Sequence, residues 1–301
     1  MIRLDAATVL LQWAVGGIAF CWFTTRRRMV GLGYGWLLRG VYLVMAVGAL
    51  LAGLSLAGPR VGVVVVREMA SLGVAVSCLV ALAVSVARRR AGVVGQRAEH
   101  DRRSARVAAM TGIDRDTHHE DAGRRHPHGH VAAATAREFP PGLDLVPVAF
   151  GVVGLVAAGV DAGGNTGVAV LRTLVGAAFL GAVTDAMLLG HWYLVQPGLP
   201  RGLLHELVDA LGWVWPVEVA SLLLPVGMIS VWSGAVDDGW GGTLGWFWGA
   251  CAVTTIALVV VTKAALRERQ YSAVMAATGL LYLAILTAFG TDLVARAVLS
   301  G

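Results

Sequence analysis

Charged side chains are scarce in this sequence of 301 residues. Only 14% of the residues are Asp, Glu, Lys or Arg, whereas a soluble domain has about 25%. Hydrophobic residues make up 57%, against about 45–50% in a soluble domain. This excess is too large for one ordinary soluble core, so the composition indicates a polytopic membrane protein.

Cysteine is also scarce, and the three thiols are far apart. Cys21, Cys78 and Cys251 lie in three separate apolar runs, and no CxxC spacing occurs. No disulfide framework or zinc site can be built from such positions. We expect all three to be buried thiols, because a free cysteine packs like a small hydrophobic residue.

Recognisable catalytic motifs are absent from the sequence. It has no Walker A loop, no nucleophile elbow, no HExxH, and no GxGxxG followed by an acidic residue. A paired DxxxD that would hold Mg²⁺ and a diphosphate is absent as well. Nucleotide binding and the common hydrolase mechanisms therefore have no support, and whether the chain is an enzyme stays open.

Long apolar runs, in contrast, are abundant. Eight are long enough to cross a bilayer, which takes about 20 residues, and in lipid such runs must be helical. The first is expected to be a retained helix, since its arginines follow the apolar stretch, unlike those of a signal peptide. We predict an all-α, polytopic transmembrane helical bundle of about eight spanning helices: 6–25, 34–57, 68–87, 143–162, 168–193, 203–231, 243–263 and 272–299.

The basic residues are distributed unevenly between the two sides of this bundle. If the chain starts outside, 19 of the 24 Lys and Arg residues fall in cytoplasmic loops. The positive-inside rule then places both termini outside the cytoplasm, in a multi-pass protein of the plasma or inner membrane. The net charge of +5 is thus a signal of topology and not of nucleic-acid binding.

One connection differs from the rest and divides the predicted chain into 1–87, 88–142 and 143–301. Segment 88–142 is basic, rich in histidine and nearly free of aromatics, so we predict a disordered cytoplasmic loop between three and five helices. Its "HPHGH" tract offers three imidazoles to a transition metal such as Zn, Cu or Ni. Contact of the loop with anionic lipid headgroups is the alternative. The metal candidates are His126, His128 and His130.

Two further histidines, His191 and His205, flank the short turn "YLVQPGLPRGLL". Two imidazoles on a helical hairpin are candidates for ligating haem b, although His191 is also placed to hydrogen-bond the turn. His205 shares a helix face with Asp209, and Glu206 lies beside them in an amphipathic stretch. An acid–base or metal dyad is one interpretation of that face, and an interfacial helix entry is the other.

Two carboxylates lie inside apolar runs and are harder to explain by an interface. We place Asp185 about four residues inside the fifth run and Glu218 near the middle of the sixth, between two prolines. An intramembrane carboxylate is costly unless it is protonated, paired or hydrated, and it defaults to a functional hypothesis. Structural hydrogen bonding is the alternative. Asp292 and Arg296, at i and i+4, predict an ion pair at the membrane interface.

Three functions are compatible with these features. The first is a non-catalytic or accessory subunit of a membrane complex, for example a respiratory or redox complex. The second is a proton-coupled transporter that uses Asp185 and Glu218. The third is an enzyme acting on a lipid-linked substrate at the cytoplasmic face through the histidines and acids named above. The expected partners are the lipid bilayer and other membrane subunits, and the cofactor, haem b or a transition metal if there is one, stays open.

Overall fold

The computed structural model describes residues 5–56, 62–91, 93, 139–196, 199–268 and 270–299, and helices are the regular elements in these ranges. They follow one another along the chain as a series of long, mostly apolar helices with short connections. In order they are α1 (Ala6–Thr25), α2 (Leu32–Leu56), α3 (Val63–Ala87), η3 (Pro141–Asp144), α6 (Leu145–Asp161), α7 (Thr166–Val195), α8 (Gly202–Leu223), α9 (Ile229–Trp232), α10 (Thr243–Arg267) and α11 (Tyr271–Leu299).

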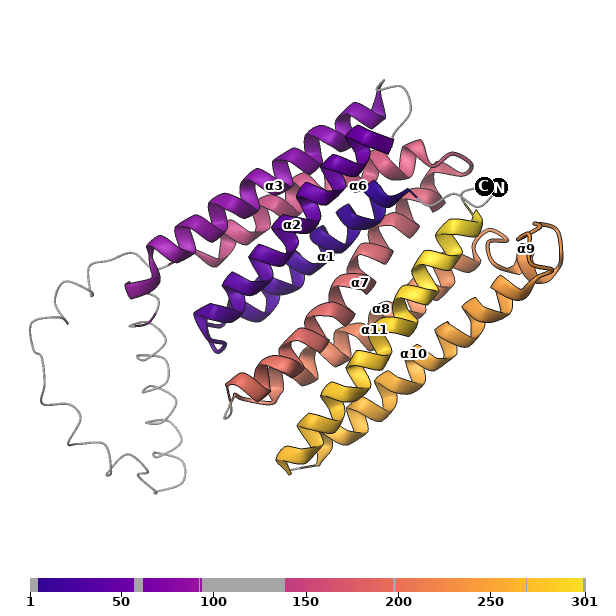
Figure 1. Ribbon diagram of the computed structural model, residues 1–301. Coiled ribbons are helices and arrows are strands. Elements are labelled where there is room, and N and C mark those ends of the chain that lie inside the picture. The colour runs from indigo at the N-terminus through magenta and orange to yellow at the C-terminus, as the bar shows by residue number, and fades with distance from the viewer. Residues whose placement is uncertain are drawn as a thin grey trace, which may run out of the picture.

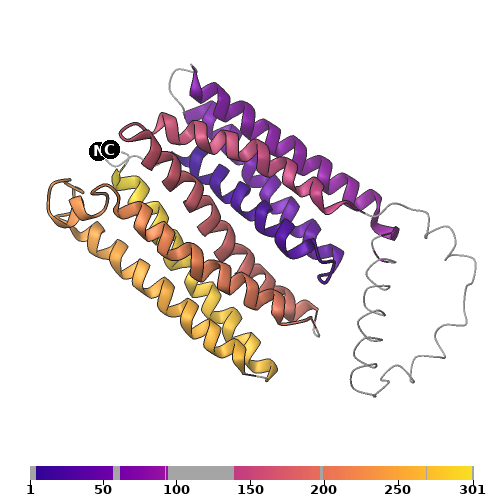
Figure 2. The same ribbon diagram turned by 180° about the vertical axis from the view of Figure 1, so that it is seen from behind.

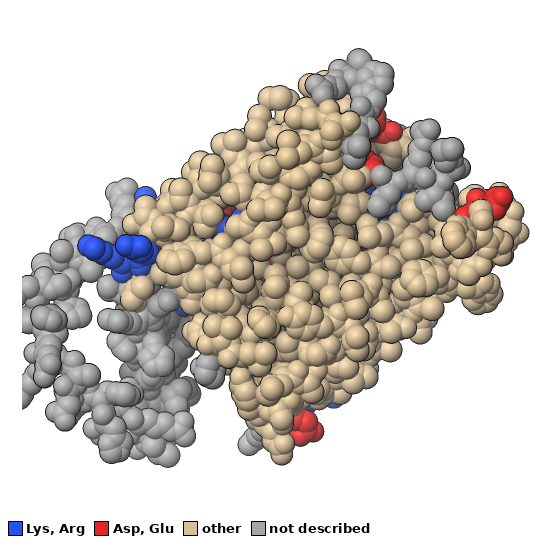
Figure 3. Space-filling view, viewed as in Figure 1, with Lys and Arg blue, Asp and Glu red and all other residues tan. Residues whose placement is uncertain are grey.

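Seven of these helical segments are long and apolar enough to cross a membrane. They correspond to seven of the eight predicted runs and confirm a polytopic, all-α membrane protein that contacts the bilayer. The remaining run forms α8, which is 22 residues long but carries Glu206, Asp209 and Glu218. In Figure 3 the charged side chains visible on this face lie mainly at the ends of the bundle, as lipid-facing sides require.

The sixth predicted run, which forms α8, ends earlier than expected. We predicted a helix over 203–231, but α8 ends at Leu223 and a turn leads to the short α9. Pro225 lacks a backbone N–H and Gly227 has a positive φ of 39°, so the helix cannot continue through this segment. Glu218 therefore lies five residues from the end of its helix, about 8 Å at 1.5 Å per residue, and not near the middle.

Asp185, in contrast, lies deeper in its helix than the sequence had suggested. Helix α7 runs to Val195, so Asp185 lies ten residues before its end, about 15 Å inside the bundle. The sequence had suggested about four residues. Of the two intramembrane carboxylates, Asp185 is thus the deep one and Glu218 the one nearer an end.

The long helices run side by side in alternating directions, and α1 and α7 lie centrally (Figures 1 and 2). α1 packs on α2, α6 and α7, and α7 packs on α6, α8 and α11, with α10 against α11 and α8. α6 packs on α3 and α1 although segment 88–142 separates them in sequence. α1 begins and α11 ends at the same end of the bundle (Figure 1). The division of the chain at 88–142 stays a prediction.

The central contact between α1 and α7 depends on glycine. A Cβ on Gly16 would lie 1.7 Å from the carbonyl oxygen of Ala177, and one on Gly181 would lie 2.2 Å from the carbonyl carbon of Gly16. The two backbones therefore touch, as small residues four apart on α7 allow. Ala177 and Gly181 thus bring α7 into direct contact with the backbone of α1 at Gly16.

One short polar side chain holds the backbone at the start of α10. Asp238, which is buried in the α9–α10 loop, accepts hydrogen bonds from the backbone N–H groups of Gly242 at 2.8 Å, Trp240 at 2.9 Å and Leu244 at 2.9 Å. These N–H groups would otherwise lack partners at the start of α10. Hydrogen bonds from Gly242 first, then from Trp240 and Leu244, hold the pKa of Asp238 below its ordinary value.

Candidate functional site

A cluster of buried and half-buried charged groups lies where α8 and α11 pack on α7, and we call it the Glu218 site. It comprises Glu218 of α8, Asp292 and Arg296 of α11, and Arg172 of α7. Both carboxyl side chains are fully buried, with no exposed surface. From the helix bounds, Glu218 lies about 8 Å and Asp292 about 10 Å inside the same end of the bundle.

Asp292 and Arg296 form an ion pair inside this site. The Nε atom of Arg296 lies 2.8 Å from both carboxylate oxygens of Asp292. Its Nη2 atom donates to the backbone carbonyl of Arg172 at 2.9 Å. The sequence predicted the pair correctly but placed it at the membrane interface, whereas the structure buries it beside a second carboxyl group.

No N–H or hydroxyl donor among the described residues contacts either carboxyl oxygen of Glu218. The side chain within hydrogen-bonding reach of Glu218 is the carboxyl group of Asp292. The electrostatic neighbours of Glu218 are Asp292 first, then Arg296 and Arg172. Burying a carboxylate without donors is costly, so this environment destabilises the ionised form of Glu218.

Arg172 uses its guanidinium group to hold the end of α8. Its Nε atom donates to the carbonyl of Ser221 at 3.0 Å, and its Nη2 atom donates to the carbonyl of Leu224. The last carbonyls of a helix lack intrahelical partners and carry the negative end of the helix dipole, so a cation is stabilising there. This contact ties α7 to the helix that bears Glu218.

Gly176 provides the space for the Glu218 site on α7. A Cβ at this position would lie 2.5 Å from Nη2 of Arg296, 2.6 Å from Oδ1 of Asp292 and 2.9 Å from Nε2 of Gln12. Gln12 of α1 donates to the carbonyl of Thr173 at 2.8 Å, and its Oε1 atom has no partner among the described residues. Sequence reasoning missed Gln12 and Gly176, because neither stands out without the neighbouring helices.

Asp185 lies in a separate site at the interface of α7 and α2. Tyr42 of α2 donates its hydroxyl hydrogen to one carboxylate oxygen, and the other oxygen has no partner among the described residues. Asp185 and Tyr42 are both fully buried. The ring of Tyr42 crosses Gly17 of α1, where a Cβ would lie 2.0 Å from the ring. The hydrogen-bond partner of Asp185 is therefore a tyrosine, not Glu218 or His191.

The two histidines of the predicted haem site have different neighbours. The Nδ1 atom of His191 lies 3.3 Å from the hydroxyl oxygen of Tyr282 on α11. The Nε2 atom of His205 lies 3.2 Å from the carbonyl oxygen of Leu266 on α10. Each histidine has a structural contact, and haem ligation stays a prediction.

The two carboxylates beside His205 form ion pairs with different helices. Glu206 pairs with Arg27, and Asp209 pairs with Lys263 at 2.5 Å. The described part of the chain contains no group of three or more His, Cys, Asp or Glu side chains that could hold a metal ion. The acid–base dyad on this face stays a prediction. His126, His128 and His130 lie outside the described residues.

The strongest chemical signal is thus the pair of buried carboxyl groups, Glu218 and Asp292, one of which is ion-paired. Two such groups side by side can share one proton, since two adjacent negative charges disfavour each other.

Comparisons with protein-family models, curated proteins and solved structures give no significant match to this chain.

Proposed function

We propose that this polytopic membrane protein is a proton-coupled transporter, and that Glu218 is the group that binds and releases the proton. The observation that carries the proposal is the burial of Glu218 beside a second carboxyl group. Glu218 is fully buried, no N–H or hydroxyl donor among the described residues contacts its oxygens, and its hydrogen-bonding neighbour is the ion-paired Asp292.

The charges around Glu218 favour its protonated form. Arg296 is committed to Asp292, and Arg172 is turned toward the carbonyls at the end of α8. Ionising Glu218 would therefore add a second buried carboxylate without a dedicated cation, which is the unfavourable case for buried charges. In this proposal the proton is on Glu218, and Asp292 pairs with Arg296.

Proton release from Glu218 has a mechanical consequence. The new negative charge attracts the nearest guanidinium groups, those of Arg296 and Arg172. A shift of Arg172 toward Glu218 weakens its hydrogen bonds to Ser221 and Leu224, which hold the end of α8 against α7. Protonation therefore biases the contact between these two helices, as a local charge change does in a switch.

The two carboxylate sites lie at different depths. The Glu218 site is near the end of the bundle where α1 begins, and the Asp185 site is about 15 Å inside the other end. The predicted orientation, from 19 of 24 basic residues, would open the Glu218 site toward the outside. Protons would then enter at Glu218, and Asp185 with Tyr42 would form the deeper site.

Infrared spectroscopy tests the proton-binding step. A protonated carboxyl group has a carbonyl stretching band that is absent from a carboxylate. We expect such a band at neutral pH in reconstituted protein, and we expect it to be lost in Glu218→Gln. The matched control is Glu206→Gln, which removes a partly exposed carboxylate, ion-paired with Arg27, on the same helix and should leave the band unchanged. If Glu218→Gln keeps the carbonyl band of the wild type, the assignment of the proton to Glu218 is overturned.

Proton flux in proteoliposomes tests transport. Vesicles that contain a pH-sensitive dye receive a potassium diffusion potential, and internal acidification is followed. The wild type and Glu206→Gln should acidify faster than empty vesicles, and Glu218→Gln should not. If vesicles with the wild type acidify no faster than empty vesicles, transport is rejected. If the wild type still shows the infrared band in that case, Glu218 remains a proton-binding group.

The accessory-subunit and lipid-substrate hypotheses remain alternatives. The contacts of His191, His205, Glu206 and Asp209 do not favour the enzyme over a purely structural role. A native purification in which other membrane subunits accompany the chain would support the accessory role.

A further inference from the structure

The Glu218 site is buried, so water and protons reach it only by passing between helices. The contact of α1 with α7 closes one approach. The two backbones touch there, since a Cβ on Gly16 would lie 1.7 Å from the carbonyl oxygen of Ala177. Gly16 lies four residues, about 6 Å, deeper along α1 than Gln12, which borders the site. Water therefore does not approach Glu218 from deeper in the bundle along this interface.

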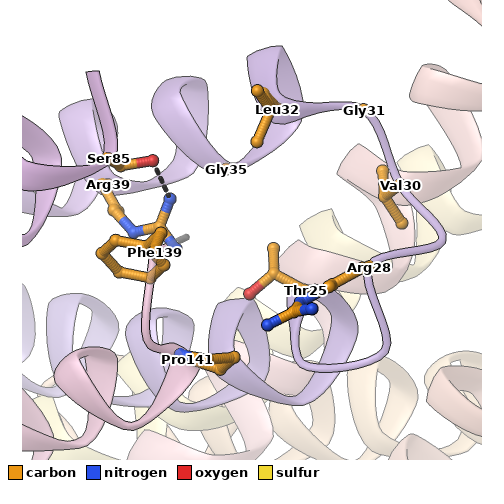
Figure 4. A pocket seen from close by; sticks show the side chains of 10 residues that line it. All are labelled: Thr25, Arg28, Val30, Gly31, Leu32, Gly35, Arg39, Ser85, Phe139 and Pro141. Atoms are coloured by element: carbon orange, nitrogen blue, oxygen red, sulfur yellow. Dashed lines mark hydrogen bonds between the residues drawn. The ribbon is translucent and has the colours of Figure 1, made fainter. Parts of the chain in front are cut away.

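A pocket at the opposite end of the bundle does not lead to the site either. It is formed where α1 ends and α2 begins, and its lining includes Thr25, Arg39 and Phe139 (Figure 4). The guanidinium group of Arg39 pairs with Asp144 and is covered by the ring of Phe139. Thr25 lies 13 residues beyond Gln12 on α1, about 20 Å along the helix axis. The contact between α1 and α7 lies between this pocket and the Glu218 site.

An apolar cluster covers the site on the side of α9 and α10. It begins one helical turn from each carboxyl group, because Leu222 is at i+4 from Glu218 and Ala295 is at i+3 from Asp292. Apolar packing offers no hydrogen-bond partner to water or to a charge, so entry through it is costly. The buried members of the cluster are Leu222, Met228, Val231, Trp248, Ala295 and Val298.

A further side of the site is bordered by polar groups that share one face of α1. Asp5, Thr8 and Gln12 are at i, i+3 and i+7, and we call them the α1 polar face. The side chain of Asp5 is 50% exposed and accepts the hydroxyl hydrogen of Thr8. Arg67 of α3 joins this pair, with Nη1 2.6 Å from Oδ2 of Asp5 and 3.5 Å from Oγ1 of Thr8. The α1 polar face thus begins at solvent.

Gln12 connects the α1 polar face to the Glu218 site. It is fully buried, its Nε2 atom donates to the carbonyl of Thr173, and its Oε1 atom has no partner among the described residues. A Cβ on Gly176 would lie 2.9 Å from Nε2 of Gln12 and 2.6 Å from Oδ1 of Asp292, so both atoms border the same point. Asp292 is in turn the hydrogen-bonding neighbour of Glu218. An unpaired buried acceptor is a point to which a water molecule can donate.

We propose that water enters along the α1 polar face and delivers the proton to Glu218. The inference rests on the proposed function, because it assigns a route to the proton-binding group named there. In the transfer step a hydronium ion gives one proton to the carboxylate of Glu218 and becomes neutral water, and proton release is the reverse step. Gln12 does not take the proton. It is a positioning residue that accepts a hydrogen bond from water beside Asp292.

Cysteine labelling in nanodiscs tests the route itself. A cationic, water-soluble methanethiosulfonate reagent is added, and modification of the protein is followed by mass spectrometry. Gln12→Cys should react at least about tenfold faster than Ala14→Cys, because only the first position borders the route. Thr8→Cys should likewise react faster than Ala7→Cys. Both alanines are buried and lie on the opposite face of α1, and the wild type gives the background, since its three cysteines are buried.

Deuterium exchange tests whether the route leads to Glu218. In heavy water, the infrared carbonyl band of a protonated carboxyl group shifts as its hydrogen is replaced. Gln12→Leu should slow this shift by at least about tenfold, and Gln12→Asn, which keeps an amide, should slow it less. A variant that merely loosens the bundle would exchange faster, so slower exchange is not explained by a loss of structure.

A second pair of variants applies if Gln12→Leu fails to fold. Thr8→Val removes a hydroxyl group from the α1 polar face and should slow the exchange. Thr24→Val makes the same change at a buried threonine near the other end of α1, whose hydroxyl donates to carbonyls of its own helix. Thr24→Val should exchange as fast as the wild type.

The route and the proposed function fail in different ways. A wild type without a carboxyl band overturns proton binding at Glu218, and the labelling rates still decide whether water follows the α1 polar face. Equal labelling of Gln12→Cys and Ala14→Cys overturns the route, even if Thr8→Cys reacts quickly, because the path then stops short of the site. A carboxyl band that exchanges as fast in Gln12→Leu as in the wild type also overturns the route and leaves Glu218 the proton-binding group.

Discussion

Neutralising the two neighbouring carboxyl groups of the Glu218 site should change stability by very different amounts. Asp292→Asn removes the partner of Arg296, whose Nε atom lies 2.8 Å from both oxygens of Asp292. The Arg296 side chain is 15% exposed and Asp292 is fully buried, so the variant leaves a nearly buried cation without its anion. Breaking a buried pair in this way costs about 3–5 kcal/mol.

Glu218→Gln should have almost no effect on stability. No N–H or hydroxyl group in the described part of the chain donates to either oxygen of Glu218, so the substitution removes no such hydrogen bond. If Glu218 is protonated, its carboxyl group donates one hydrogen toward Asp292, and the amide of glutamine donates in the same way. The expected change in the free energy of unfolding is below about 1 kcal/mol.

Thermal unfolding in detergent measures the difference. The three buried cysteines, Cys21, Cys78 and Cys251, are natural reporters, since a thiol-reactive dye labels them only when the bundle opens. Asp292→Asn should lower the unfolding temperature by roughly 10 °C, and Glu218→Gln by no more than a few degrees. A loss in Glu218→Gln as large as that in Asp292→Asn would show that Glu218 is ionised and would refute the reasoning.

Three further predictions follow from single contacts. Gly176→Ala should lower the unfolding temperature by displacing the Glu218 site, whereas Gly279→Ala on α11, where a Cβ meets nothing within 4 Å, should not. Tyr42→Phe removes the hydrogen bond on Asp185, and the same thermal assay should show a loss of about 1–3 kcal/mol. Asp238→Ala should be less stable than the wild type at neutral pH. Because the pKa of Asp238 is lowered on folding, that difference should shrink as pH falls below about 4, in unfolding measured against pH. A pH-independent difference would contradict the capping role of Asp238.

Composition and hydrophobic run length determined the fold class. Seven of the eight predicted runs are helices that can cross a membrane, because a chain in lipid must satisfy its backbone hydrogen bonds within each segment. The buried state of the three cysteines is also confirmed. These properties depend only on neighbours along the chain, so the sequence alone was sufficient to predict them.

The tertiary structure decided which polar groups meet. Glu218 could not be matched to Asp292, 74 positions later, because that contact depends on how α8 and α11 each pack on α7. Gly176 and Gln12 belong to the Glu218 site only because α1, α7 and α11 converge there. The depth of Asp185 depended on the end of α7, and helix ends are set by local caps and turns that apolar runs do not reveal. The sequence determined that this chain crosses a membrane, and helix packing determined which of its few charges are isolated inside it.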